Sequence, residues 1–375
     1  MDDATLVTLI AVFEVLLAGT LVAVLPLVSR RGLLFGAYVG ERHDRGPSAR
    51  DLKRSWFRQT TVLIAACLGV SLAVGLTGHP IAAVFVALGT EIAGLTAIYV
   101  RHHRRALGLA VPASSPGLAA ASLLPVPAGT LVFPALALAI NLTLGVVVTA
   151  YAARQYDRLP GVVPIHFKGS GLPDGWAKKS FASVMAMPLG TLLMGAMVAG
   201  IGLLTAQAKR SLRADDQGIS LYAQQRYRNA LARFLSGISL VMTAMLSGMS
   251  YDAVRIGLGD PPTFGPWLLA CGGLVAAWAI GGSIYLIVRY GQGGARLEAA
   301  IADRPLTNGL ADDRNWRWGV FYVNREDPSL MIEKRFGVGY TLNFGNPRAI
   351  VIMIGIVVVI GTVLGLALAA VPARH

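Results

Sequence analysis

The chain has 375 residues, of which 54% are hydrophobic and only 14% are charged, with a formal net charge of +13. Soluble domains carry about 25% charged residues, so this composition excludes an ordinary soluble domain. Nearly uncharged runs of ~20 residues recur along the chain, and a helix of that length spans the hydrocarbon core of a bilayer. The sequence therefore predicts an all-α polytopic membrane protein whose main partner is the lipid bilayer.

Eight apolar runs are long enough to cross the membrane. The first follows an acidic start instead of the basic start of a signal peptide, so we expect it to be retained as a span. The expected spans are 5–28, 61–78, 81–100, 131–152, 181–205, 234–254, 266–288 and 349–371.

Lys and Arg are unevenly distributed between the two sides of these spans. Segments 29–60, 101–130, 206–233 and 289–348 hold 26 of the 33 basic residues, and the alternate segments hold seven. Loops rich in Lys and Arg stay in the cytoplasm, so both termini are predicted to lie outside. Because juxtamembrane basic residues set orientation and attract anionic lipid, we expect no direct binding of nucleic acid.

The spans and loops predict five consecutive parts. They are four N-terminal spans in 1–152, an outer loop in 153–180, three spans in 181–288, a cytoplasmic segment in 289–348, and the last span with its tail in 349–375.

Three local signals refine this plan. Ser48 is a candidate N-cap for a helix that enters the second span. Four prolines between residues 107 and 130 predict a linker along the membrane surface instead of a spanning helix. Gly273, Ala277 and Gly281, at four-residue spacing, predict that the seventh span approaches a neighbouring helix closely.

The cytoplasmic segment 289–348 contains turn-rich sequence between short apolar runs. Residues 319–323 resemble a strand, 324–328 a turn, and 334–344 a returning second strand. Two short strands alone are marginally stable, so we expect the segment to pack on the cytoplasmic ends of the helices. Asn346-Pro347 fits the N-cap and first residue of the last span.

The outer loop contains the longest polar interruption on its side of the membrane, Leu159–Trp176. Pro160 and Pro164 favour extended backbone, and the glycines that follow, Gly171 among them, favour turns. His166 and Asp174 are candidates to contact a peptide or a cation, while Phe167 and Trp176 suit the headgroup level. The loop is therefore predicted to be either a recognition element or a rigid lid over the outer face.

Three acidic residues fall within the predicted spans, namely Glu14, Glu91 and Asp252. Ionisable groups at membrane depth are costly, so each is a functional candidate as part of a proton or cation relay. Structural alternatives for the glutamates are protonation or a hydrogen bond to Ser, Thr or Asn141, and the alternative for Asp252 is an ion pair with Arg255. If the glutamates act in transport, they should face one water-accessible cavity.

Common enzymatic signatures are absent from the sequence, including HExxH, GxxxxGK[ST] and GxSxG. Residues 257–260 spell GxGD, but an aspartyl dyad needs a second carboxylate that shares its proton. Cys67 and Cys271 lie in apolar runs, which favours neither a disulfide nor a zinc site. We therefore expect no enzymatic activity, cofactor or metal.

The outer loop LPGVVPIHFKGSGLPDGW resembles the signature LP-x-x-(I/V)P-x-HF-(x)n-G-x-PDGW of the DUF1648 membrane family, to which SdpI-type immunity proteins belong. The resemblance rests on Pro160, Pro164, His166, Phe167, Gly171, Pro173, Asp174 and Trp176.

Residues 315–347 resemble a second pattern, the DUF5808 motif, and LLFGAYVG is similar to the LFGV-x-VP that follows the first span in such proteins. The second resemblance rests on Trp316, Gly319, Phe321, Tyr322, Asn324, Asp327, Pro328, Lys334, Arg335, Gly337, Gly339, Thr341, Asn343, Phe344 and Gly345.

SdpI-like proteins protect against a secreted peptide toxin and recruit a repressor to the membrane. The resemblance thus implies a non-enzymatic protein of the bacterial cytoplasmic membrane whose outer loop binds a peptide or envelope component. It also implies contact with a cytoplasmic regulator through Trp316, Gly319, Tyr322, Asn324, Asp327, Arg335, Gly339 and Asn343. The alternative from the residues alone is a proton- or cation-coupled transporter that uses Glu14 and Glu91.

Overall fold

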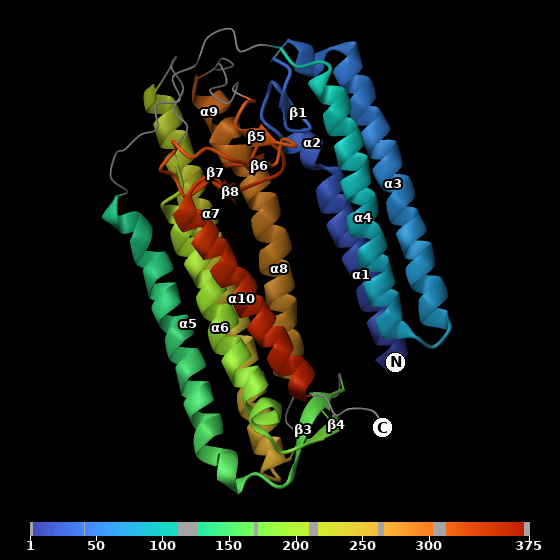
Figure 1. Cartoon of the computed structure of the whole chain (residues 1–375), viewed down its shortest axis with the longest axis vertical. Helices are drawn as coiled ribbons and strands as arrows, with labels where there is room; N and C mark the ends of the chain where they lie inside the picture. The colour runs from blue at the N-terminus through green and yellow to red at the C-terminus, as the bar shows by residue number, and fades with distance from the viewer. Residues whose placement is uncertain are drawn as a thin grey trace. The chain divides into compact units, whose positions relative to one another are not determined.

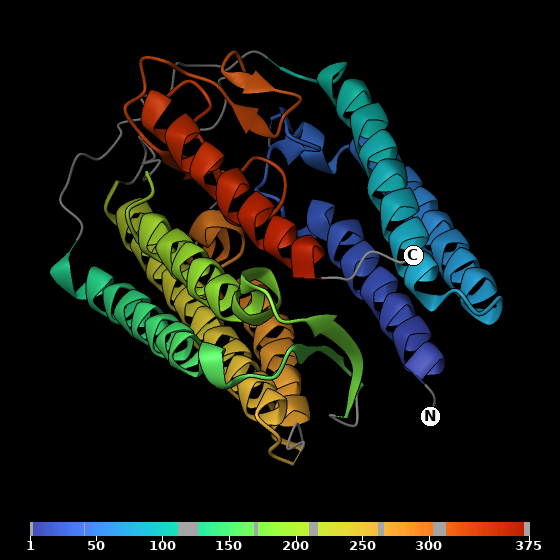
Figure 2. The same ribbon diagram turned by 60° about the horizontal axis from the view of Figure 1, so that its bottom comes forward.

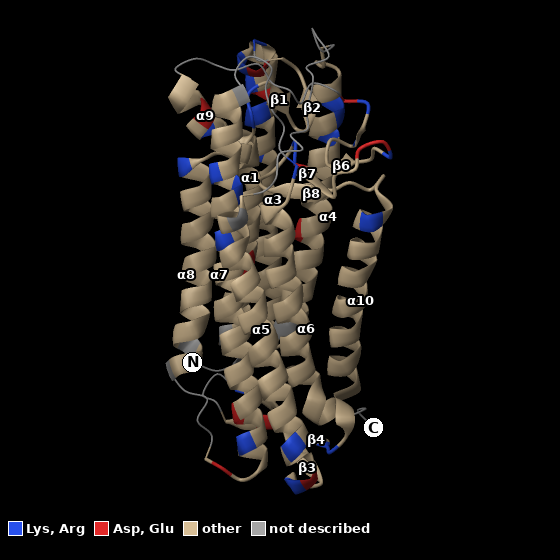
Figure 3. Ribbon diagram, turned by 90° about the vertical axis from the view of Figure 1, so that its left-hand side faces the viewer, with Lys and Arg blue, Asp and Glu red and all other residues tan. Residues whose placement is uncertain are grey.

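The structure is a computed structural model that describes residues 3–40, 42–111, 127–168, 172–209, 217–261, 266–302 and 313–370. It is mostly helical, and eight of the described helices are long and apolar enough to cross a membrane (Figure 1). The prediction of an all-α polytopic membrane protein with eight spans is therefore confirmed. Lys and Arg lie mainly toward the ends of the long helices, and the middles are nearly uncharged (Figure 3).

The chain divides into two compact units, and each combines separate stretches of sequence. The first unit contains Met1–Ser122, Lys209–Gln225 and Ile287–Asn346. The second contains Leu123–Ala208, Arg226–Leu286 and Pro347–His375.

The first unit is built on three long helices that pack on one another, α1 (Asp3–Ala23), α3 (Pro47–Leu76) and α4 (Pro80–Leu107). Aromatic rings fill its core, because Trp56 is fully buried beside Phe35 and Phe336. The indole Nε1 of Trp56 donates a hydrogen bond to the carbonyl of Ala23 at 2.9 Å, which ties α3 to the end of α1.

Short elements cover one end of these three helices. The helical ones are α2 (Leu25–Val28), α9 (Ala295–Ala302) and the 3-10 turns η1 (His43–Arg45) and η3 (Gln292–Gly294). The strands are β1 (Leu33–Leu34), β2 (Ala37–Tyr38), β5 (Trp316–Arg317), β6 (Phe321–Tyr322), β7 (Met331–Glu333) and β8 (Tyr340–Leu342).

The strand pairing predicted for the segment 289–348 is wrong in its partners. β6 pairs with β5 across the turn at Trp318–Gly319, and β8 pairs with β7. The expected pairing of 319–323 with 334–344 survives only as one isolated parallel bridge between Tyr322 and Asn343. Strands of two or three residues contribute little pairing energy of their own, so contacts with the surrounding elements select their partners.

The second unit contains α5 (Ala128–Gln155), α6 (Phe181–Ala206), most of α7 (Gln217–Gly257) and of α8 (Pro266–Arg289), and α10 (Pro347–Ala370). α6 packs on both α5 and α10. It also contains η2 (Tyr156–Arg158) and a hairpin of β3 (Val162–Phe167) and β4 (Pro173–Lys178).

Helices of the second unit approach one another closely at glycine residues. These glycines are not the ones that the four-residue spacing predicted. A Cβ on Gly145 would lie 2.6 Å from Leu192, and a Cβ on Gly195 would lie 2.6 Å from Thr243. Among the described atoms, none lies within 4 Å of the Cβ position of Gly273 or Gly281. The four-residue spacing therefore identified small residues but not the face at which α8 packs.

The predicted start is wrong for α3 and confirmed for α10. α3 begins at Pro47 after Gly46, and no side chain caps it, so Ser48 is not its N-cap. Proline is well suited to the first helical position because it has no amide hydrogen to satisfy. α10 begins at Pro347 as predicted. The predicted linker 107–130 falls largely on residues 112–126, which lie outside the described residues.

Candidate functional site

The predicted outer loop folds as the β3–β4 hairpin, which lies against the start of α6 (Figure 2). The ladder shifts register on either side of His166, so the hairpin is irregular there. Gly175 stands opposite His166, and a Cβ on Gly175 would lie 2.7 Å from the Cβ of His166. Glycine at this position therefore allows the two strands to pair at the histidine.

The hairpin brings His166 and Asp174 into contact, which the sequence did not predict. The Nδ1 of His166 donates to Oδ1 of Asp174 at 2.6 Å, since a carboxylate oxygen accepts. The His166 side chain is 72% exposed. Because Nδ1 is hydrogen-bonded to the carboxylate of Asp174, Nε2 is the ring nitrogen that can contact a ligand. If the sequence had been interpreted as a hairpin with its turn at the glycines, the strand register would have predicted that His166 and Asp174 lie close together.

The other predicted residues of the loop have different environments. Pro164 is buried, Phe167 is half-buried, and Pro160 and Trp176 are exposed. Trp176 stands opposite Pro164 in the ladder and is 48% exposed, so its indole is accessible on the surface of the hairpin. Gly171 lies outside the described residues.

An apolar cavity of about 520 Å³ lies between the hairpin and the helices of the second unit. Its walls come from β3, α6, α7 and α10 and include Pro164, Phe167, Met187, Val254 and Val363. Small-molecule pockets usually have volumes of about 300–1,000 Å³ and mostly apolar linings. The cavity can therefore hold an apolar group, with His166 on the strand β3 that borders it and Asp174 on the paired strand β4.

Three hydroxyl groups, those of Ser183, Thr191 and Ser250, are the polar side chains among the helix residues that line this cavity. The Ser183 hydroxyl donates to the Lys178 carbonyl. The Thr191 and Ser250 hydroxyls lie 3.3 Å apart and hydrogen-bond to each other. Each also donates within its own helix, Thr191 to the Met187 carbonyl and Ser250 to the Leu246 carbonyl. Since these hydroxyls already have partners, the cavity favours an apolar occupant over a polar one.

The predicted intramembrane acids Glu14 and Glu91 are neighbours in the first unit. Glu91 on α4 is 1% exposed, and among the described residues neither of its carboxyl oxygens has a hydrogen-bond partner. The Glu14 carboxyl on α1 interacts with it electrostatically, and a Cβ on Gly19 would lie 2.6 Å from the Glu91 Oε1. Asn141, a suggested partner, instead donates to Ser239.

The third acid, Asp252, forms an ion pair with Arg255, which was the alternative to a functional role. Its carboxylate lies 3.6 Å from Arg255 one turn later on α7, and Arg255 also bonds Asp260 at 2.9 Å. Asp252 is therefore part of an ion-pair cluster at the end of α7 in the second unit, whereas Glu14 and Glu91 belong to the first unit.

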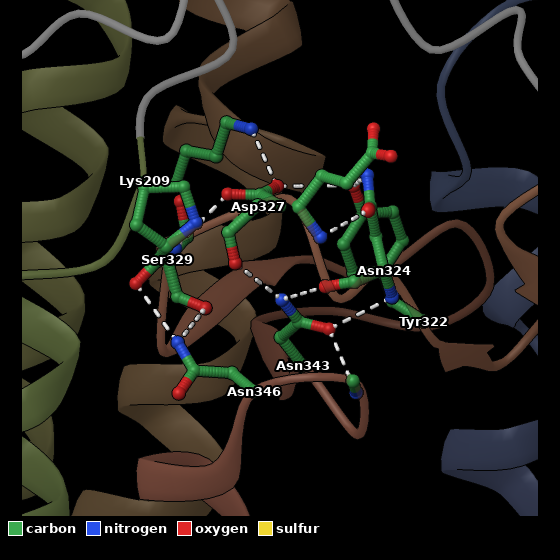
Figure 4. A network of polar contacts seen from close by, with 10 residues as sticks. Lys209, Tyr322, Asn324, Asp327, Ser329, Asn343 and Asn346 are labelled. Carbon is green, nitrogen blue, oxygen red and sulfur yellow. Dashed lines mark hydrogen bonds and ion pairs between the residues drawn. The ribbon is translucent and has the colours of Figure 1, made fainter.

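Four of the predicted cytoplasmic residues form one polar network in the first unit (Figure 4). Asp327 accepts from the Lys209 ammonium at 2.6 Å and from the Tyr322 hydroxyl at 3.0 Å. The fully buried Asn343 amide donates to the carbonyls of Asn324 and Asp327 and accepts from the amide hydrogen of Asn324. These bonds use the side chains to hold the turn between β6 and β7.

The Asp327 carboxyl is held in its charged form. Burial alone would raise its pKa, but hydrogen bonds from Lys209 and Ser329 and the charge of Lys209 outweigh that effect, and the pKa lies below its ordinary value. The network is therefore an ionic anchor between Lys209, just after α6, and the segment 313–346.

The remaining four predicted residues also have structural contacts. Arg335 pairs with Asp313, and its guanidinium stacks over the Trp316 ring with 5.1 Å to the centroid. Gly319 and Gly339 adopt left-handed backbone with φ of +69° and +100°. Within the described part of the chain, the exposed aromatic surface of this segment instead comes from Trp318 and Phe321. The sequence did not single out Trp318, and it indicated Phe321 only through the DUF5808 resemblance.

A buried ion pair is a further feature that the sequence did not reveal. Arg30, just after α2, pairs with Glu333 on β7 at 2.7 Å, and both side chains are nearly inaccessible. The backbone amide of Arg30 donates to Gln292, and its guanidinium donates to the carbonyl of Gly293. Three distant segments of the first unit thus meet at this pair.

The described residues include no group of three or more His, Cys, Asp or Glu side chains placed to hold a metal ion.

Two family models match parts of this chain. One, a domain of unknown function (DUF1648), matches residues 143–192, which include the end of α5, the hairpin and the start of α6. The other, a family of unknown function (DUF5808), matches residues 325–350. No curated protein and no solved structure matches.

The matched ranges define how far the two resemblances extend. The DUF1648 match includes the whole hairpin with His166 and Asp174. The DUF5808 match includes Asp327, Arg335 and Asn343, whereas Trp316 and Gly319 precede it. The chain is therefore a multi-pass membrane protein with both kinds of segment.

Proposed function

We propose that this chain is a non-enzymatic, SdpI-like protein of the bacterial cytoplasmic membrane that binds a peptide toxin or another envelope component through the β3–β4 hairpin. The observation that carries the proposal is the exposed His166–Asp174 pair on a hairpin that also borders an apolar cavity of about 520 Å³. The DUF1648 match over residues 143–192 includes this hairpin.

The two features suit the two chemical parts of an amphipathic ligand. The imidazole, with Nδ1 bound to Asp174, offers Nε2 to a polar or charged group. The adjacent cavity is bordered by Phe167 and the helices. An apolar group that enters it gains about 25 cal/mol of binding free energy for each Å² of apolar surface removed from water. A membrane-active peptide or a lipid-linked envelope component has both kinds of group.

The proposal assigns a second contact to the opposite side of the membrane. By the distribution of Lys and Arg, the segment 313–346 faces the cytoplasm. Its exposed Trp318 and Phe321 offer an aromatic surface to a regulatory protein, while Asp327 and Asn343 keep the segment folded.

The test begins with a strain that lacks the gene and is screened for sensitivity to membrane-active peptides. Replacing His166 by alanine is expected to raise sensitivity about ten-fold or more, because a hydrogen bond to a charged group contributes about 1.5–3 kcal/mol. Asp174→Asn should have the same direction of effect, since the carboxylate orients the imidazole. Growth inhibition is measured at equal membrane abundance.

The matched control is Lys168→Gln, which changes an exposed residue next to the same strand without touching the pair. It should protect as well as the parent. Full protection by both the His166→Ala and Asp174→Asn variants would exclude the hairpin as the recognition site.

A second function, proton- or cation-coupled transport, is favoured by one observation. Glu91 is a buried carboxyl group without a hydrogen-bond partner among the described residues, and Glu14 is close enough to interact with it. Unpartnered acids inside a membrane protein are costly and mark ion or proton pathways. Among the described residues, however, neither glutamate lines the apolar cavity below the hairpin.

Reconstituted liposomes test this second function. If Glu91 carries protons, the parent protein should dissipate an imposed pH gradient faster than empty liposomes, and Glu91→Gln should lose at least 90% of that rate, because the amide cannot bind and release a proton. Asp252→Asn, which changes an acid in an ion-pair cluster, is the control and should retain the rate. If liposomes with the parent protein and empty liposomes lose the pH gradient at the same rate, the transport function is excluded.

A further inference from the structure

Two left-handed turns meet back to back in the first unit. Phe35 and Gly36 connect β1 to β2 with φ of +45° and +81°, and Trp318 and Gly319 lead from β5 to β6 with φ of +51° and +69°. A Cβ on Gly36 would lie 2.7 Å from the carbonyl oxygen of Gly319. The turns therefore touch through their glycine backbones, which no larger residue would allow.

α4 holds both turns in this conformation. The Tyr99 hydroxyl donates to the Trp318 carbonyl at 2.8 Å and to the Phe35 carbonyl at 3.3 Å, and the His103 Nδ1 donates to the Phe35 carbonyl at 2.8 Å. Bulky residues rarely adopt positive φ, and each such residue costs about 1–3 kcal/mol. The packing thus maintains a strained position for the Trp318 indole, which is 68% exposed.

A cavity of about 350 Å³ opens beside the two turns. Besides Gly36, Gly319 and the aliphatic Val100 and Leu107 of α4, its lining consists of charged and aromatic side chains. These are His103, Arg104, Asp313, Trp316, Arg317, Trp318 and Arg335.

The charges that line this cavity do not balance. It has three arginines and one carboxylate, and Asp313 is already paired with Arg335. Arg104 and Arg317 are exposed, and within the described part of the chain neither lies within 4.0 Å of a carboxylate oxygen. Two guanidinium groups at the cavity thus remain to attract an anion.

The position of the cavity at the end of a membrane span indicates which kind of anion it binds. Apart from Glu91, α4 has no charged residue before its last turns, which carry Arg101, Arg104 and Arg105, so the cavity lies where a membrane span ends. Indoles and arginines are typical of the headgroup level, and basic pockets on the cytoplasmic side bind anionic headgroups. The planar guanidinium also matches two oxygens of a phosphate group.

We propose that this cavity binds a phosphate group through Arg104 and Arg317, with Trp316 and Trp318 as its aromatic walls. The shared chemistry is a phosphate monoanion or diester, which is supplied either by the headgroup of an anionic phospholipid or by free phosphate. The site is independent of the β3–β4 hairpin, so it stands whether or not the hairpin binds a peptide.

The experiment uses the full chain in nanodiscs of phosphatidylcholine. In one arm phosphatidylglycerol is added to the bilayer, and native mass spectrometry counts the phosphatidylglycerol molecules that remain bound. In the other arm inorganic phosphate is titrated into phosphatidylcholine nanodiscs and followed by calorimetry. The test variant is R104Q/R317Q, and the control is R101Q/R105Q, which removes two exposed arginines of the same helix that do not line the cavity.

The parent is expected to retain phosphatidylglycerol or to bind phosphate, and R104Q/R317Q should bind about 25-fold more weakly. That factor corresponds to about five-fold for each basic residue removed near an anionic group. The control should bind within two-fold of the parent. Retention of lipid assigns the site to a headgroup, and binding of phosphate without lipid retention assigns it to free phosphate.

Either of two outcomes overturns the proposal. One is that the parent shows neither phosphatidylglycerol retention nor phosphate binding. The other is that R104Q/R317Q and R101Q/R105Q lose binding to the same extent, which would mean that only diffuse surface charge attracts the lipid. Because Arg104 and Arg317 are exposed, their replacement should leave the thermal midpoint of unfolding within 2 °C of the parent.

Discussion

Replacing Glu333 by glutamine is expected to lower the free energy of unfolding by about 3–5 kcal/mol, since removal of one partner leaves a buried charge uncompensated. Glu333 is the ion-pair partner of Arg30, and both side chains are nearly inaccessible. Burial alone would lower the pKa of Arg30, but Glu333 and Glu298 raise it above its ordinary value. The guanidinium stays charged even when Glu333 is removed, because arginine is not deprotonated in proteins.

Thermal unfolding of the purified protein in detergent measures this effect. Glu326→Gln is the control, because Glu326 is exposed in the same segment and should change the midpoint little. The double variant Arg30→Met/Glu333→Met removes both charges and should be more stable than Glu333→Gln. A Glu333→Gln midpoint equal to that of the parent would contradict the assignment of a buried charge pair.

Replacing Gly319 by alanine is expected to destabilise the first unit by about 2–5 kcal/mol. Its φ of +69° strains any residue with a side chain, and the added Cβ would lie 2.8 Å from His103 and 2.9 Å from the Gly36 backbone. Since the backbone of the opposing turn cannot rotate away, the two turns must separate. The thermal midpoint and the protease sensitivity of the segment 313–346 report this change.

Gly337→Ala separates the two causes of that effect. Gly337 also has positive φ, +91°, but the atom nearest its Cβ position is 3.9 Å away. It should therefore show only the backbone strain, about 1–2 kcal/mol. If Gly319→Ala costs no more than Gly337→Ala, close contact between the Phe35–Gly36 and Trp318–Gly319 turns is not present in solution.

The sequence predicted features whose cause is local. A run of ~20 apolar residues must form a helix in the bilayer because its backbone groups can bond only to one another, so all eight spans could be located. Pro347 marked the start of α10 for a similarly local reason, the missing amide hydrogen. Turn residues between Phe167 and Pro173 likewise indicated that the loop 159–176 changes direction, whereas Gly175, also expected in a turn, lies within β4.

Predictions that required a partner were less successful. The stripe of Gly273, Ala277 and Gly281 does not identify a close helix contact, because spacing along one helix says nothing about which face a neighbour covers. The pairing of 319–323 with 334–344 was wrong because strands so short are selected by their surroundings. Ser48 is not a cap because Gly46 and Pro47 begin the helix one residue before it.

The candidate sites depend on which residues the folded chain brings into contact. His166 and Asp174 meet only because the register of the hairpin places them together across its turn. Glu14 and Glu91 are neighbours because α1 packs on α4. Composition does not contain this information, and the spacing of His166 and Asp174 becomes informative only when the register of the hairpin is known.

By itself, the sequence determined the membrane class, the eight spans, the distribution of basic residues and the irregular loop between α5 and α6. These follow from the preference of each short segment for lipid, water or a turn. Only the tertiary structure decided that Arg30 meets Glu333, that Gly36 meets Gly319, and that Arg104 and Arg317 line one cavity. Such pairings depend on which distant surfaces exclude water together, and that is a property of the folded chain.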